Sequence, residues 1–408
     1  EVFVILNDTF CYTNATETVE KCSLYIAKMR NTLVYVKEET SMISIHTFSL
    51  LLKEDKKLYK TLEKALEDLT DRNVQKSYYP FVKGKEKGYV GSKIYKCFRD
   101  TGINRIILKT IYEEDTKMPK AYKMLFVINP KHLLGDFQQP FTTIISPELL
   151  PRVSEKFNDF IHTIAPTLPD ITEKCILCRI DYCFNFWMNS QEEVEEYFKL
   201  LQASRIPAHF KIKKMYNSKQ HRKTKRKGEL TLECKSYELS LYLKKIQLDK
   251  AEYCESEEVE NATGQLRVEL RYKRKKNYQE KKKLNINEEW GLLEVKDPQE
   301  TLDKKLKKMY GIGDFYKYKD AIAQIEESPF SMKVKINMRL LLDITKKSRN
   351  LTEAEIVYGK EYVNKTMRYF NKLNLSPITI PTRSIHDYYP NPIKYITGES
   401  TKYLRKDN

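Results

Sequence analysis

The sequence has no apolar run long enough to span a bilayer. Its first residues, EVFVILNDTF, lack the basic start and the small-residue cleavage site of a secretion signal. These two absences predict a protein that works in the cytoplasm and has no membrane partner.

Residues that build zinc sites are also scarce. The chain has 8 Cys and 6 His among 408 residues, and only Cys175 and Cys178 form a CxxC pair. No second CxxC pair and no suitably spaced His pair accompanies them, so we expect no structural zinc. Several cysteines lie in apolar, strand-like runs, where Cys acts as a small hydrophobe.

Positive charge is what the sequence has in excess. Its 73 Lys and Arg against 56 Asp and Glu leave a net charge of +17. A chain this basic attracts polyanions, and nucleic acid is the commonest of these in a cell. A basic surface kept only for solubility is the simpler alternative. The length and the 41% hydrophobic content predict two or three domains with real cores.

Apolar and polar residues alternate in the most informative region, between residues 179 and 271. The alternation is found in RIDYCFNF (179–186), ELTLECK (229–235), ELSLYLK (238–244) and QLRVELR (265–271). A period of two predicts strands with one apolar face. Four such strands predict an antiparallel sheet that helices cover on one side, with a polar platform on the other.

Helical periodicity lies on both sides of these strands. Ser190 is placed to cap the segment 190–202, with Glu193 answering it as in a capping box. After Trp290 three segments have helical patterns: 297–311, 332–347 and 352–374. The Tyr-Gly break at 358–359 before a basic helix fits a helix-turn-helix arrangement, and an ordinary helical bundle explains it equally well.

Acidic side chains on the polar face repel one another unless something uses them. Asp181 and Glu269 lie on different strands but share this face, and with Glu233 they suit a hard cation such as Mg²⁺ or Mn²⁺. Tyr242 points to the same face with Lys244 beside it. A Tyr hydroxyl can attack phosphorus, and a nearby cation can neutralise the phosphate. Taken singly, each residue also has a structural explanation, as a surface ion pair or a strand aromatic.

Two basic runs flank the polar face, KQHRKTKRKG (219–228) and RYKRKKNYQEKKK (271–283). Each can be a solvated surface, but two runs beside one sheet favour a phosphate-binding rim. The side chains that we expect to contact DNA are Arg179, Arg267, Arg271, Lys273, Arg274, Lys223, Lys225, Arg226, Lys365 and Arg368.

The chain resembles replication initiators of the filamentous-phage gene II protein type, which occur in phages and plasmids of low-GC bacteria. The resemblance covers roughly the last two-thirds of the chain. It runs in order through FVINPKHLLG (126–135), RIDYCFNF (179–186), ELSLYLKKIQL (238–248), GQLRVELRYKRK (264–275) and KTMRYFNKLNLSPITIP (365–381).

This resemblance implies a metal-dependent tyrosine endonuclease of rolling-circle replication, related to relaxases and built on an RRM-like sheet. Such enzymes cut one DNA strand, stay attached to the 5′ phosphate and rejoin the ends after replication. By motif, Asp181 and Glu269 are expected to be metal-site acids, and Tyr242 with Lys244 the catalytic pair. None of the His residues forms the adjacent His-hydrophobic-His pair of relaxases, which favours carboxylate ligands. Tyr237 has the opposite strand parity and competes with Tyr242 as the nucleophile.

We therefore expect an α+β protein with an RRM-like antiparallel sheet, helices on one of its faces and a helical C-terminal domain. The expected parts are an N-terminal region of unclear role (1–100), a nicking domain (101–288) and a DNA-binding domain (289–408). The expected partners are DNA, as an origin hairpin or a single strand, and host replication proteins. A non-enzymatic DNA- or RNA-binding protein that uses the same sheet is the alternative. A structural or partner-binding protein with a basic face is the third hypothesis.

Overall fold

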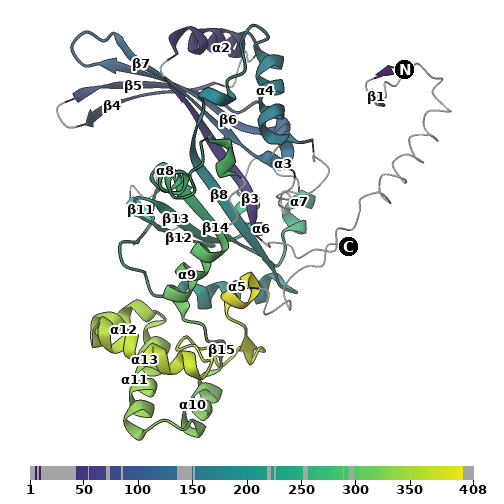
Figure 1. Ribbon diagram of the computed structural model, residues 1–408. Helices are drawn as coiled ribbons and strands as arrows, with labels where there is room; N and C mark the ends of the chain where they lie inside the picture. The colour runs from purple at the N-terminus through teal and green to yellow at the C-terminus, as the bar shows by residue number, and fades with distance from the viewer. Residues whose placement is uncertain are drawn as a thin grey trace, which may run out of the picture. The chain divides into compact units, whose positions relative to one another are not determined.

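The computed structural model describes 5–6, 9–10, 43–53, 55–69, 74–83, 86–135, 149, 152–217, 222–224, 227–250, 256–287, 289–293 and 298–397. The chain divides into two units, Glu1–Ser41 and Met42–Asn408. In the first unit the described residues form one small antiparallel pair, β1 (Ile5–Leu6) with β2 (Thr9–Phe10). The second unit contains the large sheet and most of the labelled helices (Figure 1).

A ten-stranded antiparallel sheet forms the centre of the second unit, in the order β4-β5-β6-β7-β3-β8-β14-β13-β12-β9. Its strands are β3 (Ser44–Lys53), β4 (Gln75–Lys83), β5 (Glu86–Tyr95), β6 (Ile103–Glu113), β7 (Pro119–Ile128), β8 (Ile176–Trp187), β9 (Lys211–Ile212), β12 (Glu229–Glu233), β13 (Tyr237–Leu243) and β14 (Gln265–Lys273). The predicted α+β class with an antiparallel sheet is confirmed. The sheet is larger than expected because β3, β4 and β5 come from the first hundred residues, with β3 paired between β7 and β8.

The sheet consists of two halves with the same order of elements. In each half a first strand is followed by a helix, and then by a meander whose last strand pairs back with the first. One half is β3, α2 (Lys56–Leu69) and β4 to β7, and the other is β8, α5 (Gln191–Gln202), β9 and β12 to β14. The first strands of the two halves, β3 and β8, pair with each other at the centre.

Helix α5 begins with the predicted capping box. The Oγ of Ser190 accepts from the backbone N–H of Glu193 at 3.1 Å, and Oε2 of Glu193 accepts from the N–H of Asn189 at 2.9 Å. The helix has a buried apolar stripe of Val194, Tyr197, Phe198 and Leu201, and Tyr197 packs on Phe186 of β8 with 6.2 Å between ring centroids. Burial of this stripe holds α5 on the apolar face of the second half.

The apolar face of the first half is covered in the same way by α2 and α4 (Val153–Ile164). Tyr59 of α2 contacts Tyr122 of β7, with 4.8 Å between ring centroids. Phe157 of α4 meets Phe126 of β7 edge to face at 5.1 Å. One continuous apolar core therefore lies on this side of the sheet.

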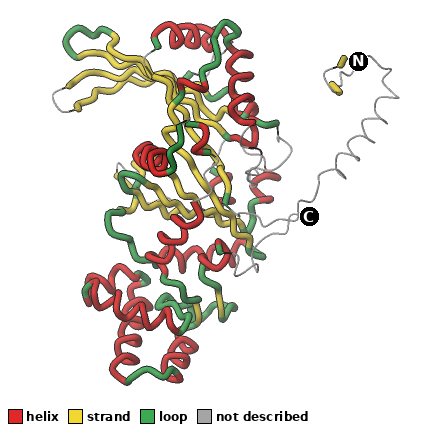
Figure 2. The backbone as a smooth tube through the Cα atoms, viewed as in Figure 1, coloured by secondary structure: helices red, strands yellow, loops and turns green. Residues whose placement is uncertain are grey.

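Helices make up most of the C-terminal part, as predicted. They are α9 (Pro298–Tyr310), α10 (Tyr318–Glu327), α11 (Met332–Ser348), α12 (Leu351–Tyr358), α13 (Lys360–Lys372) and α14 (Pro392–Ile396), with β15 (Phe315–Tyr316) paired to β16 (Tyr388–Tyr389). Helices α10 to α13 enclose a second apolar core, and they lie at the opposite end of this unit from α2 and α4 (Figures 1 and 2). Gly359 alone separates α12 from α13, and its φ of 83° suits glycine.

Short elements fill the connections between the strands. They are α3 (Pro130–Leu133), the pair β10 (Met215–Asn217) and β11 (Arg222–Thr224), α6 (Lys244–Asp249), α7 (Ser256–Asn261), α8 (Arg274–Lys283) and single 3₁₀ turns at Arg99–Thr101, Thr172–Lys174 and Trp290–Leu292. One local prediction was wrong, because Lys244 begins α6 instead of ending a strand. For most of the basic run 271–283 no element was predicted, and it folds as helix α8. Among the described residues, no helix is both long and apolar enough to cross a membrane.

Candidate functional site

The polar face of the second half carries side chains in cross-strand rows. One row contains Thr47, Asp181, Arg271 and Glu238, contributed by β3, β8, β14 and β13. The next row contains Cys183, Glu269 and Ser240, and the third contains Asn185, Arg267 and Tyr242. The prediction that Asp181 and Glu269 lie on the same face of one sheet is confirmed, and the two strands that carry them are neighbours.

Asp181 is the most heavily bonded carboxylate of these rows. Thr47 Oγ1 donates to its Oδ2 at 2.6 Å, and the Nε atoms of Arg179 and Arg271 donate to its Oδ1 at 2.8 and 2.7 Å. Burial alone would raise the pKa of Asp181, but the guanidinium groups of Arg179 and Arg271 hold the pKa of this carboxyl below its usual value. Asp181 is therefore a fixed negative charge inside the protein.

Glu269 lies between a guanidinium group and a phenol. Its Oε1 accepts from Nη2 of Arg271 at 2.8 Å, and its Oε2 accepts from the hydroxyl of Tyr242 at 3.1 Å. Burial and the negative charge of Asp181 raise the pKa of Glu269, so this carboxyl is more basic than an exposed one. Burial and the Glu269 carboxylate raise the pKa of Tyr242 well above its usual value, so the phenol keeps its proton.

Positive charge gathers beside the ring of Tyr242. Arg267 is opposite Tyr242 in the β13–β14 register, is fully buried, and donates from Nε to Oδ1 of Asn185 at 2.8 Å. Lys244 is also buried and donates from Nζ to Oε1 of Gln247 at 2.9 Å. Burial, followed by the charges of Arg267 and Lys244, lowers the pKa of His46 well below its usual value, which keeps that imidazole neutral.

The polar face differs from the open platform that the sequence predicted. Asp181 and Arg267 are 0% exposed and Tyr242 is 8% exposed. The oppositely charged side chains pair across the strands, and the arginines offset most of the predicted repulsion between the acids. What remains of it is the rise that the charge of Asp181 causes in the pKa of Glu269. Arg271 is the centre of this arrangement, because it contacts Asp181, Glu238 and Glu269 at 2.7, 2.7 and 2.8 Å.

Two other predicted residues lie apart from this cluster. Glu233 is on β12, where its oxygens pair with Lys211 at 3.5 Å and Lys273 at 3.7 Å. The strand order places β14 and β13 between Glu233 and Asp181, so the structure does not bring these two carboxylates together. Tyr237 lies on the apolar face, where its ring contacts Tyr272 with 5.5 Å between centroids.

The candidate metal ligands do not fit a divalent cation as they are arranged. Both oxygens of Asp181 and both oxygens of Glu269 already accept from nitrogen or hydroxyl donors. The guanidinium of Arg271 lies between the two carboxylates, where a bound ion would be expected. Among the described residues, no three His, Cys, Asp or Glu side chains gather in a way that could hold a metal.

The predicted DNA-contacting residues fall into three groups. Arg179, Arg267 and Arg271 belong to the buried network, and Lys273 donates to the carbonyl of Cys234 at 2.9 Å. Arg274 is exposed on α8, and Lys365 and Arg368 are exposed on α13. Lys223 is part of strand β11, while Lys225 and Arg226 lie outside the described residues.

Sequence reasoning missed three residues of this site. Thr47 and His46 come from β3, and the pairing of β3 with β8 shifts register at His46, as in a β-bulge. Glu238 was identified only as an outward-facing strand residue. The alternation in ELSLYLK signalled its face, but nothing local signalled that Arg271 would bind it from the neighbouring strand.

Comparison with known proteins identifies no family. No family model and no curated protein matches the chain. One similar solved structure is described as "Structure of Rolling Circle Replication Initiator Protein from Geobacillus stearothermophilus". It is 11% identical, with a TM-score of 0.24, and the match covers 65% of this chain and 84% of that chain. A TM-score this low establishes neither a shared fold nor a shared function.

Proposed function

We propose that this chain nicks and rejoins one strand of DNA to start rolling-circle replication, with Tyr242 as the nucleophile. The observation that carries the proposal is the hydrogen bond from the Tyr242 hydroxyl to Glu269 at 3.1 Å. Arg267, which is opposite Tyr242 in the register, and Lys244, two residues after Tyr242, are both buried cations. A nucleophile, a base and positive charge for a phosphate are thus close together on one face.

The chemistry follows from these positions. The Tyr242 oxygen attacks the phosphorus while its proton passes to Oε2 of Glu269, whose raised pKa makes it an effective base. The bond between phosphorus and the 3′ oxygen breaks, and that oxygen takes a proton from solvent. The products are a 5′-phosphotyrosine and a free 3′-hydroxyl. In the reverse step a 3′-hydroxyl attacks the phosphorus and loses its proton to solvent. The bond between phosphorus and the Tyr242 oxygen breaks, and Tyr242 recovers its proton from Glu269.

Phosphate binding requires a local opening of this network. Tyr242 is only 8% exposed, so DNA must reach its hydroxyl as the surrounding side chains separate. Arg267 is opposite Tyr242 in the strand register, and Arg271 donates to Glu269. We expect the scissile phosphate to accept from these guanidinium groups in place of Asn185 and Glu269. The net charge of +17 favours the approach of DNA to this protein.

Dependence on Mg²⁺ or Mn²⁺ stays a prediction of the sequence resemblance. An ion that binds Asp181 and Glu269 has to displace Arg271, since that guanidinium now satisfies both carboxylates. The proposed nicking and rejoining steps therefore use Tyr242, Glu269 and solvent as the proton donors and acceptors. A cytoplasmic location and contact with host replication proteins are proposed on the same resemblance.

Supercoiled plasmid that carries the DNA around the chain's own gene tests the proposal. The protein is incubated with this plasmid and Mn²⁺, and the products are separated before and after proteolysis. Protein covalently bound to a 5′ end supports the proposed function. Tight binding without a nick supports the non-enzymatic DNA- or RNA-binding alternative. Weak, salt-sensitive binding supports a structural or partner-binding protein with a basic face.

A further inference from the structure

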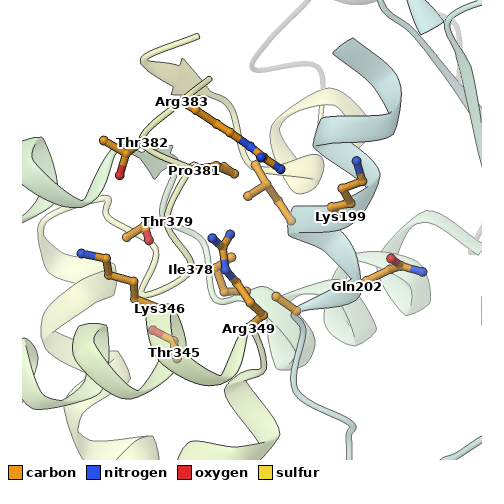
Figure 3. A pocket seen from close by; sticks show the side chains of 12 residues that line it. Lys199, Gln202, Thr345, Lys346, Arg349, Ile378, Thr379, Pro381, Thr382 and Arg383 are labelled. Atoms are coloured by element: carbon orange, nitrogen blue, oxygen red, sulfur yellow. The ribbon is translucent and has the colours of Figure 1, made fainter. Parts of the chain in front are cut away.

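A cavity of about 730 Å³ opens where three segments of the second unit meet. They are the last turns of α5, the end of α11 and the segment 378–383, which follows α13. Figure 3 shows the guanidinium groups of Arg349 and Arg383 and the amino group of Lys199 on the side chains that surround it. The cavity lies outside the Tyr242 network, between helix α5 and the helical C-terminal part.

The cavity has a strongly positive lining. Lys199, Arg349 and Arg383 are exposed, and none of the described residues that line the cavity is acidic. Within the part of the chain that the structure describes, these three side chains make no ion pair. The fourth lining cation, Lys346, lies over the ring of Tyr318 at 3.8 Å from the centroid. In the sheet network, in contrast, Arg179 and Arg271 pair with carboxylates, and Arg267 and Lys244 donate to amide oxygens.

Arg349 occupies an unusual backbone position for its residue type. It follows the last turn of α11 with φ 54° and ψ 33°, the left-handed conformation that favours glycine or asparagine at a helix end. Its N–H donates to the carbonyl of Thr345 at 2.9 Å, so the conformation ends the helix regardless of the side chain. The guanidinium of Arg349 is thus held at the cavity by the residue that ends the helix.

The floor of the cavity is aliphatic and its edge carries hydroxyl groups. Leu200 and Ile378 are 2% and 4% exposed, and Pro381 lies beside them. Thr379 and Thr382 add hydroxyls to the lining. Cations and hydroxyls suit the oxygens of a phosphate, and an aliphatic floor suits the carbon face of a sugar. None of the described lining residues is aromatic, so the cavity offers no ring on which a nucleobase can stack.

We propose that this cavity binds the sugar–phosphate backbone of DNA, without reading its sequence. The proposal rests on the proposed function, because that function makes DNA the polyanion which this chain meets. Helix α13, in the same helical part, also exposes Lys365 and Arg368. Lys199 and Arg383 contact neighbouring phosphates of one strand, and Arg349 reaches the same strand from the end of α11.

The salt dependence of DNA binding tests this proposal without any cleavage. Each phosphate that a cation neutralises releases counterions, so log K falls as log salt rises. Removing one such cationic side chain makes this negative slope shallower by about 0.9. A short duplex of arbitrary sequence is titrated with the full chain and with the Arg349→Gln/Arg383→Gln variant between low and moderate salt. We expect the slope of the variant to be shallower than that of the unmodified chain by about 1.8. The matched control, Lys319→Gln/Lys333→Gln, removes two exposed lysines of the same helical part that do not line the cavity, and its slope should stay unchanged.

The proposal would be overturned if the arginine variant kept the slope of the unmodified chain. It would also be overturned if the lysine control became shallower by the same amount as the arginine variant. A parallel titration with inorganic pyrophosphate distinguishes DNA from a small phosphate anion as the occupant. Pyrophosphate binding that needs both arginines, with no change in the DNA slope, would overturn DNA as the occupant. The slope is independent of covalent adduct formation. A reduced slope without adduct contradicts only the nicking function, and adduct with an unchanged slope contradicts only this cavity.

Discussion

The hydroxyl of Tyr242 donates to Oε2 of Glu269 across the pairing of β13 with β14, at 3.1 Å. The same glutamate receives Arg271 on its other oxygen, and Arg271 also holds Asp181 and Glu238. A phenol that would have to lose a proton thus contacts a carboxyl whose pKa burial raises. This relationship links the stability of the sheet to its proposed chemistry.

Replacing Glu269 with Gln should slow nicking by about 10²- to 10⁴-fold, the range of a lost general base. In the unmodified protein the nicking rate should rise with pH through a pKa above the usual 4.5 of Glu, because only ionised Glu269 accepts the proton. The variant should lose this acid limb of the profile while its affinity for DNA stays within about twofold. A variant with an unaltered pH profile would exclude Glu269 as the base.

Replacing Asp181 with Asn should destabilise the fold by about 3–5 kcal/mol, because Arg179 loses its carboxylate partner and Arg271 loses one of its three. The pKa of Asp181 is lowered in the folded state. Its contribution to stability is therefore present above about pH 4 and is lost as the pH falls through the folded pKa. Urea unfolding at pH 7 and at pH 3 measures this, and Asp181→Asn should lose less stability between the two than the unmodified chain. An equal loss would contradict the assignment.

Replacing Arg271 with Ala should create affinity for Mn²⁺. The change removes the guanidinium that satisfies Asp181, Glu238 and Glu269, and it leaves three carboxylates near one another. Isothermal titration with MnCl₂ should show binding at least tenfold tighter in the variant than in the unmodified chain, with the added Glu269→Gln change abolishing it. The unmodified chain would contradict this prediction if it bound Mn²⁺ tightly and lost that binding on Glu269→Gln. That result would show that the ion displaces Arg271 without the substitution.

Replacing Arg349 with Gly should stabilise the fold by about 0.5–1 kcal/mol, because glycine adopts the left-handed conformation of this helix end without strain. The same change should weaken DNA binding, since it removes a proposed phosphate contact. Thermal unfolding and duplex titration on one preparation measure both effects. A variant that gains stability and keeps the full affinity for DNA would leave Arg349 with no role beyond the helix end.

Local signals were sufficient to predict four strands and one helix around the site. Period-two alternation identified β8, β12, β13 and β14 and the face of each residue, and the Ser190 capping box identified the start of α5. These features depend on neighbours a few residues apart, so they can be read without knowledge of the fold.

Long-range pairing was not predictable in the same way. The position of β3 beside β8 brings Thr47 to Asp181 across 134 residues, and no local pattern encodes that contact. The register of β14 against β13 decides that Arg271 meets Glu238, which closes the face that was expected to be open. Helix α8 was missed because its segment RKKNYQEKKK is charged on nearly every side and lacks an apolar stripe.

The covalent attachment site on the protein tests the central claim most directly. Protein is incubated with the origin-containing DNA and digested, and the peptide that carries the nucleotide is identified by mass spectrometry. The attachment should be found on Tyr242, and Tyr242→Phe should form no adduct and still bind DNA. Tyr237→Phe, which changes a tyrosine of the same strand on the apolar face, should form adduct as the unmodified chain does. Adduct on Tyr237, or adduct that persists in Tyr242→Phe, would contradict the account.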